Sequence, residues 1–186
     1  MKKLLTLILM LLPMVAVAQE LANFILMPDG TYQTEDGKDF VIIPFEGKTA
    51  HQIYQELASN VGSTYNDPSK VMSGVEDASI KIRAFSDFLW VNKVLGITHN
   101  WGGYYQLEFR IKDGRVRVAA PVVEDIAMDT QPHEKWWYKS KLKKWFKDGV
   151  VKEGDKQKYD EIVAHMNGII NRILYTSSVQ DASEDW

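Results

Sequence analysis

Residues 104–121 constrain the fold most, because they form two runs of alternating apolar and polar residues around Asp113-Gly114. An Asp-Gly pair between such runs predicts a β-hairpin with a type I′ turn, which needs positive φ at both central residues. The two-residue turn fixes the register, so that Arg110 faces Arg117. The apolar face, which must be buried, consists of Leu107, Phe109, Ile111, Val116, Val118 and Ala120, and the charged face of Gln106, Glu108, Arg110, Lys112, Arg115 and Arg117.

Residues 1–18 have the composition of a secretory signal peptide. Two lysines precede an apolar run at residues 4–12, and the triplet Ala16-Val17-Ala18 has the small residues of a cleavage site. Cleavage near Ala18 would leave 168 of the 186 residues, and an uncleaved N-terminal anchor is the alternative. We therefore expect an exported chain that is either periplasmic or extracellular.

The chain contains no cysteine. It therefore has no disulfide, no thiolate for catalysis or metal binding, and no attachment residue of the lipoprotein type. An exported domain of this size must then be stabilised by packing alone. Loss of Lys2 and Lys3 with the signal changes the net charge from −3 to −5, which gives no overall reason to expect a nucleic-acid partner.

A lead-in segment at residues 19–38 is followed by a predicted strand at residues 39–45. This strand is a continuous apolar run rich in β-branched residues, which is typical of a strand buried on both faces or nearly so. Pro44 cannot donate a hydrogen bond to a neighbouring strand, so we expect it near the end of the strand or at a sheet edge.

Two helices are predicted, one before and one after the run of strands. The first has Thr49 as its N-cap, with Gln52 completing a capping box, and Gly62 is placed to end it. The second begins near Asp155 and has a long apolar stripe at helical spacing. The stripe consists of Tyr159, Ile162, Val163, Met166, Ile169, Ile170, Ile173 and Leu174.

Between the helices, residues 78–84 alternate cleanly and predict a strand, and residues 88–97 predict a less regular one. Residues 99–103 contain two glycines and are expected to form the turn that leads into the hairpin. After the second helix, residues 177–186 are short and acidic, and we expect them to be disordered. The order β-α-β-β-β-β-α, with two helical stripes that need the same cover, predicts a single α+β domain at residues 39–176.

Several segments also resemble a bacterial secreted family, domain of unknown function 4468 (DUF4468), which has a TBP-like fold. They are residues 45–61, 65–68, 80–85, 104–118 and 145–149. The resemblance implies a curved antiparallel sheet with two helices on one face, similar to one half of the TATA-binding protein, and it implies no activity and no functional residues. The TATA-binding protein presents its open sheet face to the DNA minor groove. Here many outward positions carry Arg or Lys and the chain is expected to be exported, so DNA binding does not carry over.

The first candidate binding site is the outward face of the predicted sheet. Lys81, Arg83, Arg110 and Arg117 would form a locally basic surface on an acidic protein, suited to an anionic ligand or partner. The alternative is the ordinary solvated side of a half-covered sheet. The facing pair of Arg110 and Arg117 favours a binding role, because like charges directly opposite one another are destabilising.

The second candidate is the basic, aromatic segment at residues 133–149, which includes Trp136 and Trp137. Aromatic residues interleaved with lysine suit a membrane surface, sugars or single-stranded nucleic acid. The alternative is that Leu142, Trp145 and Phe146 pack on the core while the lysines remain in solvent.

We expect a non-catalytic binding domain of the bacterial envelope, whose partner is a protein, a glycan or an anionic ligand. The alternatives are a hydrolase-like enzyme acting on an envelope or host polymer, and a purely structural module that docks on another chain. No catalytic motif is present, and the four histidines show no metal-ligand spacing, so neither cofactor nor metal is expected. A pocket that gathers two or more residues of one set would favour the enzyme. The set is His99, Glu108, Asp125 and His133.

Overall fold

The computed structural model describes most of the chain. The described residues are 20–128, 131–137 and 142–175, and for residues 131–137 and for Val94 the backbone alone is described. The predicted signal peptide and the predicted acidic tail lie outside these ranges. Within them, no helix combines the length and the apolar character that crossing a membrane requires.

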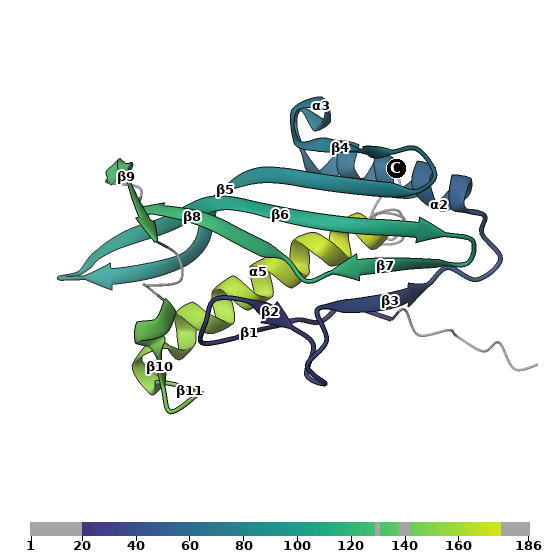
Figure 1. The fold of residues 1–186 in the computed structure, drawn as a ribbon. Coiled ribbons are helices and arrows are strands. Elements are labelled where there is room, and N and C mark those ends of the chain that lie inside the picture. The colour runs from purple at the N-terminus through teal and green to yellow at the C-terminus, as the bar shows by residue number, and fades with distance from the viewer. Residues whose placement is uncertain (1–19, 129–130, 138–141, 176–186) are drawn as a thin grey trace, which may run out of the picture.

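The described elements are strands of very different lengths and two long helices (Figure 1). In chain order they are β1 (Ile25–Leu26), β2 (Tyr32–Gln33), β3 (Phe40–Pro44), α2 (Ala50–Thr64), α3 (Pro68–Val71), β4 (Met72–Val75), β5 (Ser79–Val94), β6 (Ile97–Lys112), β7 (Arg115–Ala119), β8 (Val122–Met128), β9 (Gln131–Trp137), the 3₁₀ turn η1 (Lys143–Trp145), β10 (Phe146–Lys147), β11 (Val150–Val151), the 3₁₀ turn η2 (Glu153–Asp155) and α5 (Lys156–Tyr175). All the described strand pairings are antiparallel. The predicted α+β class with an antiparallel sheet is therefore confirmed.

The main sheet is built around β6. Its strand order is β3-β7-β6-β5-β4, and β8 pairs with β6 while β9 pairs with β8. β5 follows one edge of β6 over almost its whole length, whereas β7 and β8 share the other edge (Figure 1). β7 and β8 therefore leave a gap in the pairing along β6, at Leu107 and Glu108.

The predicted register of the β6–β7 hairpin is confirmed: Arg110 faces Arg117 and Lys112 faces Arg115. The type I′ turn is not confirmed, because Gly114 has a φ of 73° but Asp113 does not have positive φ. Contacts with the first residue of α2 and with Lys48 just before the helix explain the difference. The N–H of Gly114 donates to the Lys48 carbonyl, and the carboxylate of Asp113 accepts a hydrogen bond of 2.7 Å from the N–H of Ala50.

The expected turn at residues 99–103 is wrong, because β6 runs through these residues. The chain reverses instead at Leu95 and Gly96, which both have positive φ, 51° and 82°. Gly102 and Gly103 allow neighbouring backbones to come close instead of reversing the chain. A Cβ atom at Gly102 would lie 2.5 Å from the Ser86 carbonyl oxygen, and one at Gly103 would lie 2.3 Å from the Asp125 carbonyl oxygen. Glycine inside a strand pattern therefore marks a crowded backbone here.

β3 is an edge strand, so the expectation that it is buried on both faces is wrong. It pairs with β7 alone, and Ile42 is 41% exposed while Ile43 is fully buried. Pro44 is the last residue of this edge strand, as expected. Proline has no N–H group to donate, and this costs no hydrogen bond at the edge of β3 that has no neighbouring strand.

α2 begins as predicted, with Thr49 as N-cap and both hydrogen bonds of the capping box to Gln52. It does not end at Gly62 but continues to Thr64. α5 begins one residue after the expected Asp155. Six residues of its predicted stripe are buried: Ile162, Met166, Ile169, Ile170, Ile173 and Leu174.

Both long helices lie on the same side of the sheet, which we call the inner face (Figure 1). The core lies between the sheet and these two helices. Its fully buried residues include Phe109 and Val118 from the hairpin, Leu57 from α2 and Ile170 from α5. The side chain of Asn60 donates a 2.8 Å hydrogen bond to the Ile173 carbonyl, which satisfies the buried amide and joins the two helices.

The segment before β3 also packs on α5. The amide groups of Asn167 and Asn171 accept hydrogen bonds from the N–H groups of Phe24 and Ala22 and donate to their carbonyl groups. Phe24 is fully buried. The start of the segment that we expected to be a lead-in is thus held against the C-terminal helix at Ala22 and Phe24.

Candidate functional site: the outer face of the sheet

The side of the sheet opposite the helices carries the first predicted site. We call it the outer face. Its cations are Lys81, Arg83, Arg110, Lys112, Arg115 and Arg117, and all but the half-buried Arg117 are exposed. The antiparallel register places Lys81 beside Glu108 and Arg83 beside Gln106. The structure therefore brings the four predicted cations of this site onto one surface.

Arg83 is held by an acidic residue that the sequence reasoning did not place. Its Nε and Nη2 atoms donate to the two carboxylate oxygens of Glu124 on β8, at 2.8 and 2.7 Å. Gln106 donates to the same carboxylate, and the guanidinium lies 4.5 Å from the centre of the Tyr104 ring. Such a bidentate pair fixes the guanidinium in place.

Arg110 and Arg117 face each other, but each has its own compensating partner. Arg110 Nε donates to Glu108 at 2.7 Å, and this contact keeps the pKa of Glu108 below its ordinary value. Arg117 lies 4.1 Å from the centre of the Phe40 ring and 3.8 Å from a carboxylate oxygen of Asp39. These contacts relieve the like-charge repulsion locally, so the facing pair no longer argues for a binding role.

The surplus of charge lies instead with the other cations of the outer face. Lys81, Lys112 and Arg115 form no ion pair with any described residue. Among the described residues, Asp39, Glu108 and Glu124 pair with cations of this face, and Asp125 also attracts Arg83. The six cations therefore outnumber the carboxylates around them, on a chain whose net charge is −3.

A hollow of about 310 Å³ opens in the outer face near the gap between β7 and β8. Long side chains surround it, and the small residues Ser73, Ala119 and Ala120 leave room between them. The other lining residues are Lys81, Ile82, Arg83, Gln106, Leu107, Glu108 and Val122. Sequence reasoning could not find the hollow, because it depends on where β7 ends and β8 begins.

The second predicted site is described only in part. Leu142 is fully buried, Trp145 is 6% exposed, and Phe146 packs edge-on against Tyr159, so these aromatic and apolar residues pack on the core. In β9, the backbones of Trp136 and Trp137 pair with Ile126 and Asp125 of β8, while their side chains lie outside the described atoms. Membrane contact through residues 133–149 stays a prediction.

A second hollow, of about 230 Å³, lies beside buried tryptophans. Trp90 stacks on Trp101 and meets Trp145 edge-on, and all three rings are at most 6% exposed. Lys158 at the rim forms a 2.6 Å ion pair with Asp155. Trp90 thus contacts both other rings within the core, and Lys158 already has an acidic partner.

One serine and one histidine have the spacing of a nucleophile and its base: Ser86 Oγ lies 3.0 Å from His165 Nε2. The Ser86 hydroxyl, however, donates to the Phe88 carbonyl at 2.7 Å, so it receives a hydrogen bond from His165 rather than giving up a proton to it. Burial lowers the pKa of His165. The contact lies at an irregularity in β5 between Ser86 and Trp90, and it anchors that irregularity to α5.

The enzyme hypothesis predicts a pocket that gathers two or more of His99, Glu108, Asp125 and His133. Of these four residues, only Glu108 is among those that line the hollow of the outer face, and none is among those that line the hollow beside the tryptophans. The side chain of His133 lies outside the described atoms. Neither of these two hollows therefore provides the convergence that would favour a hydrolase.

Comparisons with known proteins add one relative and one fold. No family model matches the sequence. Flagellar hook-associated protein 2 of Campylobacter jejuni is 26% identical over 131 residues, which are 70% of this chain but only 18% of that protein. The crystal structure of a DUF4468 family protein from Bacteroides ovatus superposes with a TM-score of 0.53 and 10% identity, covering 72% of this chain and 81% of that one. The expected resemblance is thus confirmed at the level of the fold: the chain has the α+β architecture of a DUF4468 protein.

Proposed function

We propose that the chain is an exported binding module of the bacterial envelope, and that the outer face of its sheet docks an acidic segment of a partner protein. One observation carries the proposal: among the described residues the outer face, which lies opposite both long helices, holds more cations than carboxylates, and two of these cations, Lys81 and Arg83, line the hollow. A cluster of cations on an otherwise acidic protein attracts and orients an anionic partner.

The groups around the hollow suit binding better than catalysis. Lys81 can supply an ammonium donor, and Arg83 and Gln106 have donors left beyond their contacts with Glu124. Glu108 is the single carboxylate among the residues that line the hollow, and its bond to Arg110 lowers its pKa and stabilises the charged, acceptor-only form. That pairing weakens a role as general acid.

A protein partner is favoured over a small anion because apolar side chains share the face. Ile42 is 41% exposed and Val122 is 54% exposed. Interfaces between proteins combine apolar contacts with charged ones at the rim. The similarity to part of a protein named for its association with the flagellar hook agrees with an interaction role, and the predicted signal peptide is the basis for proposing export.

Site-specific photo-cross-linking in the native envelope tests this function. A photoreactive residue at Gln106, in the hollow, should capture a partner, whereas the same residue at Gln55, exposed on α2, serves as the control. Substituting Lys81, Lys112 and Arg115 with Gln should remove the product at position 106. Equal products at both positions, or a product that survives the charge substitutions, would contradict the proposal.

A further inference from the structure

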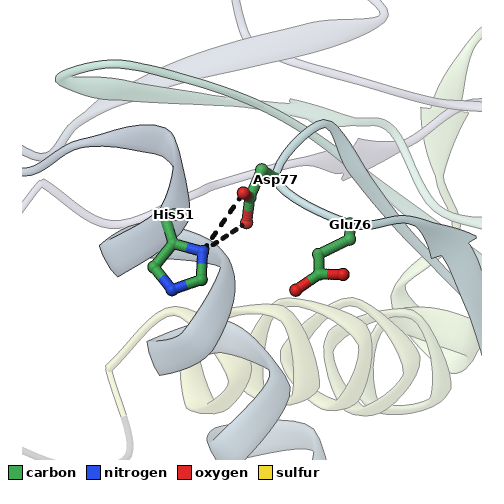
Figure 2. A group of neighbouring side chains, drawn as sticks. All are labelled: His51, Glu76 and Asp77. Atoms are coloured by element: carbon green, nitrogen blue, oxygen red, sulfur yellow. Dashed lines mark hydrogen bonds and ion pairs between the residues drawn. The ribbon is translucent and has the colours of Figure 1, made fainter.

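A histidine and two carboxylates meet at the end of the sheet where α2 begins (Figure 2). His51 is the second residue of α2, and Glu76 and Asp77 form the turn between β4 and β5. The Nδ1 atom of His51 lies 3.0 and 3.1 Å from the two carboxylate oxygens of Asp77. A carboxylate oxygen of Glu76 joins them, and one ligand atom from each residue lies within 4.8 Å of the others.

Both elements that carry these side chains are held in place. The start of α2 is fixed by its capping box and by the hydrogen bond from Ala50 to Asp113. In the turn, Asp77 has a φ of 59°, and the N–H of Ala78 donates to the Val75 carbonyl at 3.1 Å. Anchored elements of this kind preorganise the three side chains.

The contacts within the group leave the Glu76 carboxylate without a partner among the described residues. His51 contacts Asp77, but Glu76 forms no ion pair with any described residue, although it lies next to a second carboxylate. Figure 2 shows the carboxylate of Glu76 beside the pair without a bond to it. A cation placed among the three would compensate both carboxylates.

The ligand types indicate which cation. Imidazole nitrogen with carboxylate oxygens suits zinc and its transition-metal neighbours, whereas calcium and magnesium prefer oxygen alone. At bond lengths of about 2.0 to 2.2 Å, the ligand atoms of a tetrahedral zinc ion lie about 3.4 Å apart. Small rotations of the exposed side chains would bring the three ligand atoms from within 4.8 Å to that spacing.

We propose that His51, Glu76 and Asp77 bind a divalent transition-metal ion, with Zn²⁺ as the best fit and water completing its coordination. The ion would join α2 to the β4–β5 turn. In a chain without cysteine, such a link would take the place of a disulfide as a local cross-link. Sequence reasoning missed the group because His51 is separated from both acidic residues by a helix and a strand.

Calorimetric titration of the purified protein with ZnCl₂ at pH 7.5 tests the proposal. One ion should bind per chain, and zinc should raise the melting temperature, because a ligand that binds only the folded state stabilises it. His51→Gln, and separately Glu76→Gln combined with Asp77→Asn, should each weaken binding about tenfold or more. Asn tolerates the positive φ at position 77, so the turn is kept.

The chain offers a matched control in Glu35-Asp36, an acidic pair in another turn. Glu35→Gln with Asp36→Asn removes the same charge and should leave zinc binding unchanged. The proposal is overturned if zinc does not bind, if His51→Gln binds as well as the parent, or if the control weakens binding equally. Calcium binding that matches zinc and ignores His51 would also overturn it.

Discussion

The two faces of the β6–β7 hairpin carry neighbouring residues with different roles. On the inner face, Phe109 and Val118 face each other and are fully buried against the helices. On the outer face, the exposed Arg110 and the half-buried Arg117 face each other and contact acidic and aromatic partners. The inner face is accounted for by packing, while the outer face keeps a surplus of charge that packing does not require. Substitutions on the inner face should therefore alter the stability of the fold, and substitutions on the outer face should alter binding of a partner.

The largest effect is expected on the inner face. Phe109→Ala removes a fully buried ring and leaves a cavity, so the free energy of unfolding should fall by about 3 to 5 kcal/mol. Unfolding in guanidinium chloride, followed by circular dichroism, measures the change. A loss below about 1 kcal/mol would mean that the hairpin does not form the core.

A smaller effect, dependent on pH, is expected where α5 meets the bulge of β5. Burial lowers the pKa of His165 below its ordinary value of 6.5, so the unfolded chain binds a proton there more readily than the folded chain. Its contribution to stability is present above about pH 6.5 and is lost as the pH falls below that value. Denaturant unfolding from pH 8 to pH 5 should show this loss, and His165→Gln should reduce the slope. An unchanged slope in the variant would assign the loss to other groups.

The smallest effect on stability is expected on the outer face. Replacing Arg110 and Arg117 with Ser removes two exposed ion pairs and one like-charge contact, so the free energy of unfolding should change by less than about 1 kcal/mol. The same unfolding measurement checks this. A loss as large as that of Phe109→Ala would show that the outer face stabilises the fold and would remove the contrast between the two faces.

The sequence predicted what depends on local pattern. Alternation and the two-residue turn were enough for the register of Arg110 with Arg117, and the capping box at Thr49 was enough for the start of α2. The type of turn at Asp113 was not predictable, because the carboxylate of Asp113 bonds to Ala50, a residue far away in the chain. Tertiary contacts of this kind override local turn preference.

The candidate sites show the same limit. The alternating pattern placed Lys81 and Arg83 on the outer face, but the pairing of Arg83 with Glu124 depends on β8 crossing back beside β6. Gly102 and Gly103 led to the prediction of a turn, but they lie within a strand, where the crowded backbones around them require glycine. Residues that meet only through topology leave no signal in a single sequence.

The most direct test of the proposed binding face measures affinity for an acidic peptide. A fluorescently labelled oligoglutamate, followed by anisotropy, should bind the parent protein and should bind more weakly at high salt. Lys81→Gln, Lys112→Gln and Arg115→Gln together should lower the affinity about tenfold or more. The matched control removes three exposed charges from the other candidate segment, at Lys143, Lys144 and Lys147.

We expect the outer-face variant to lose affinity and the control to keep it, with both retaining the stability of the parent protein. An equal loss of affinity in the two variants would mean that binding depends only on how many positive charges are removed, and not on where they lie. A loss confined to the control would place the binding surface in the basic, aromatic segment at residues 133–149 and would contradict binding by the outer face.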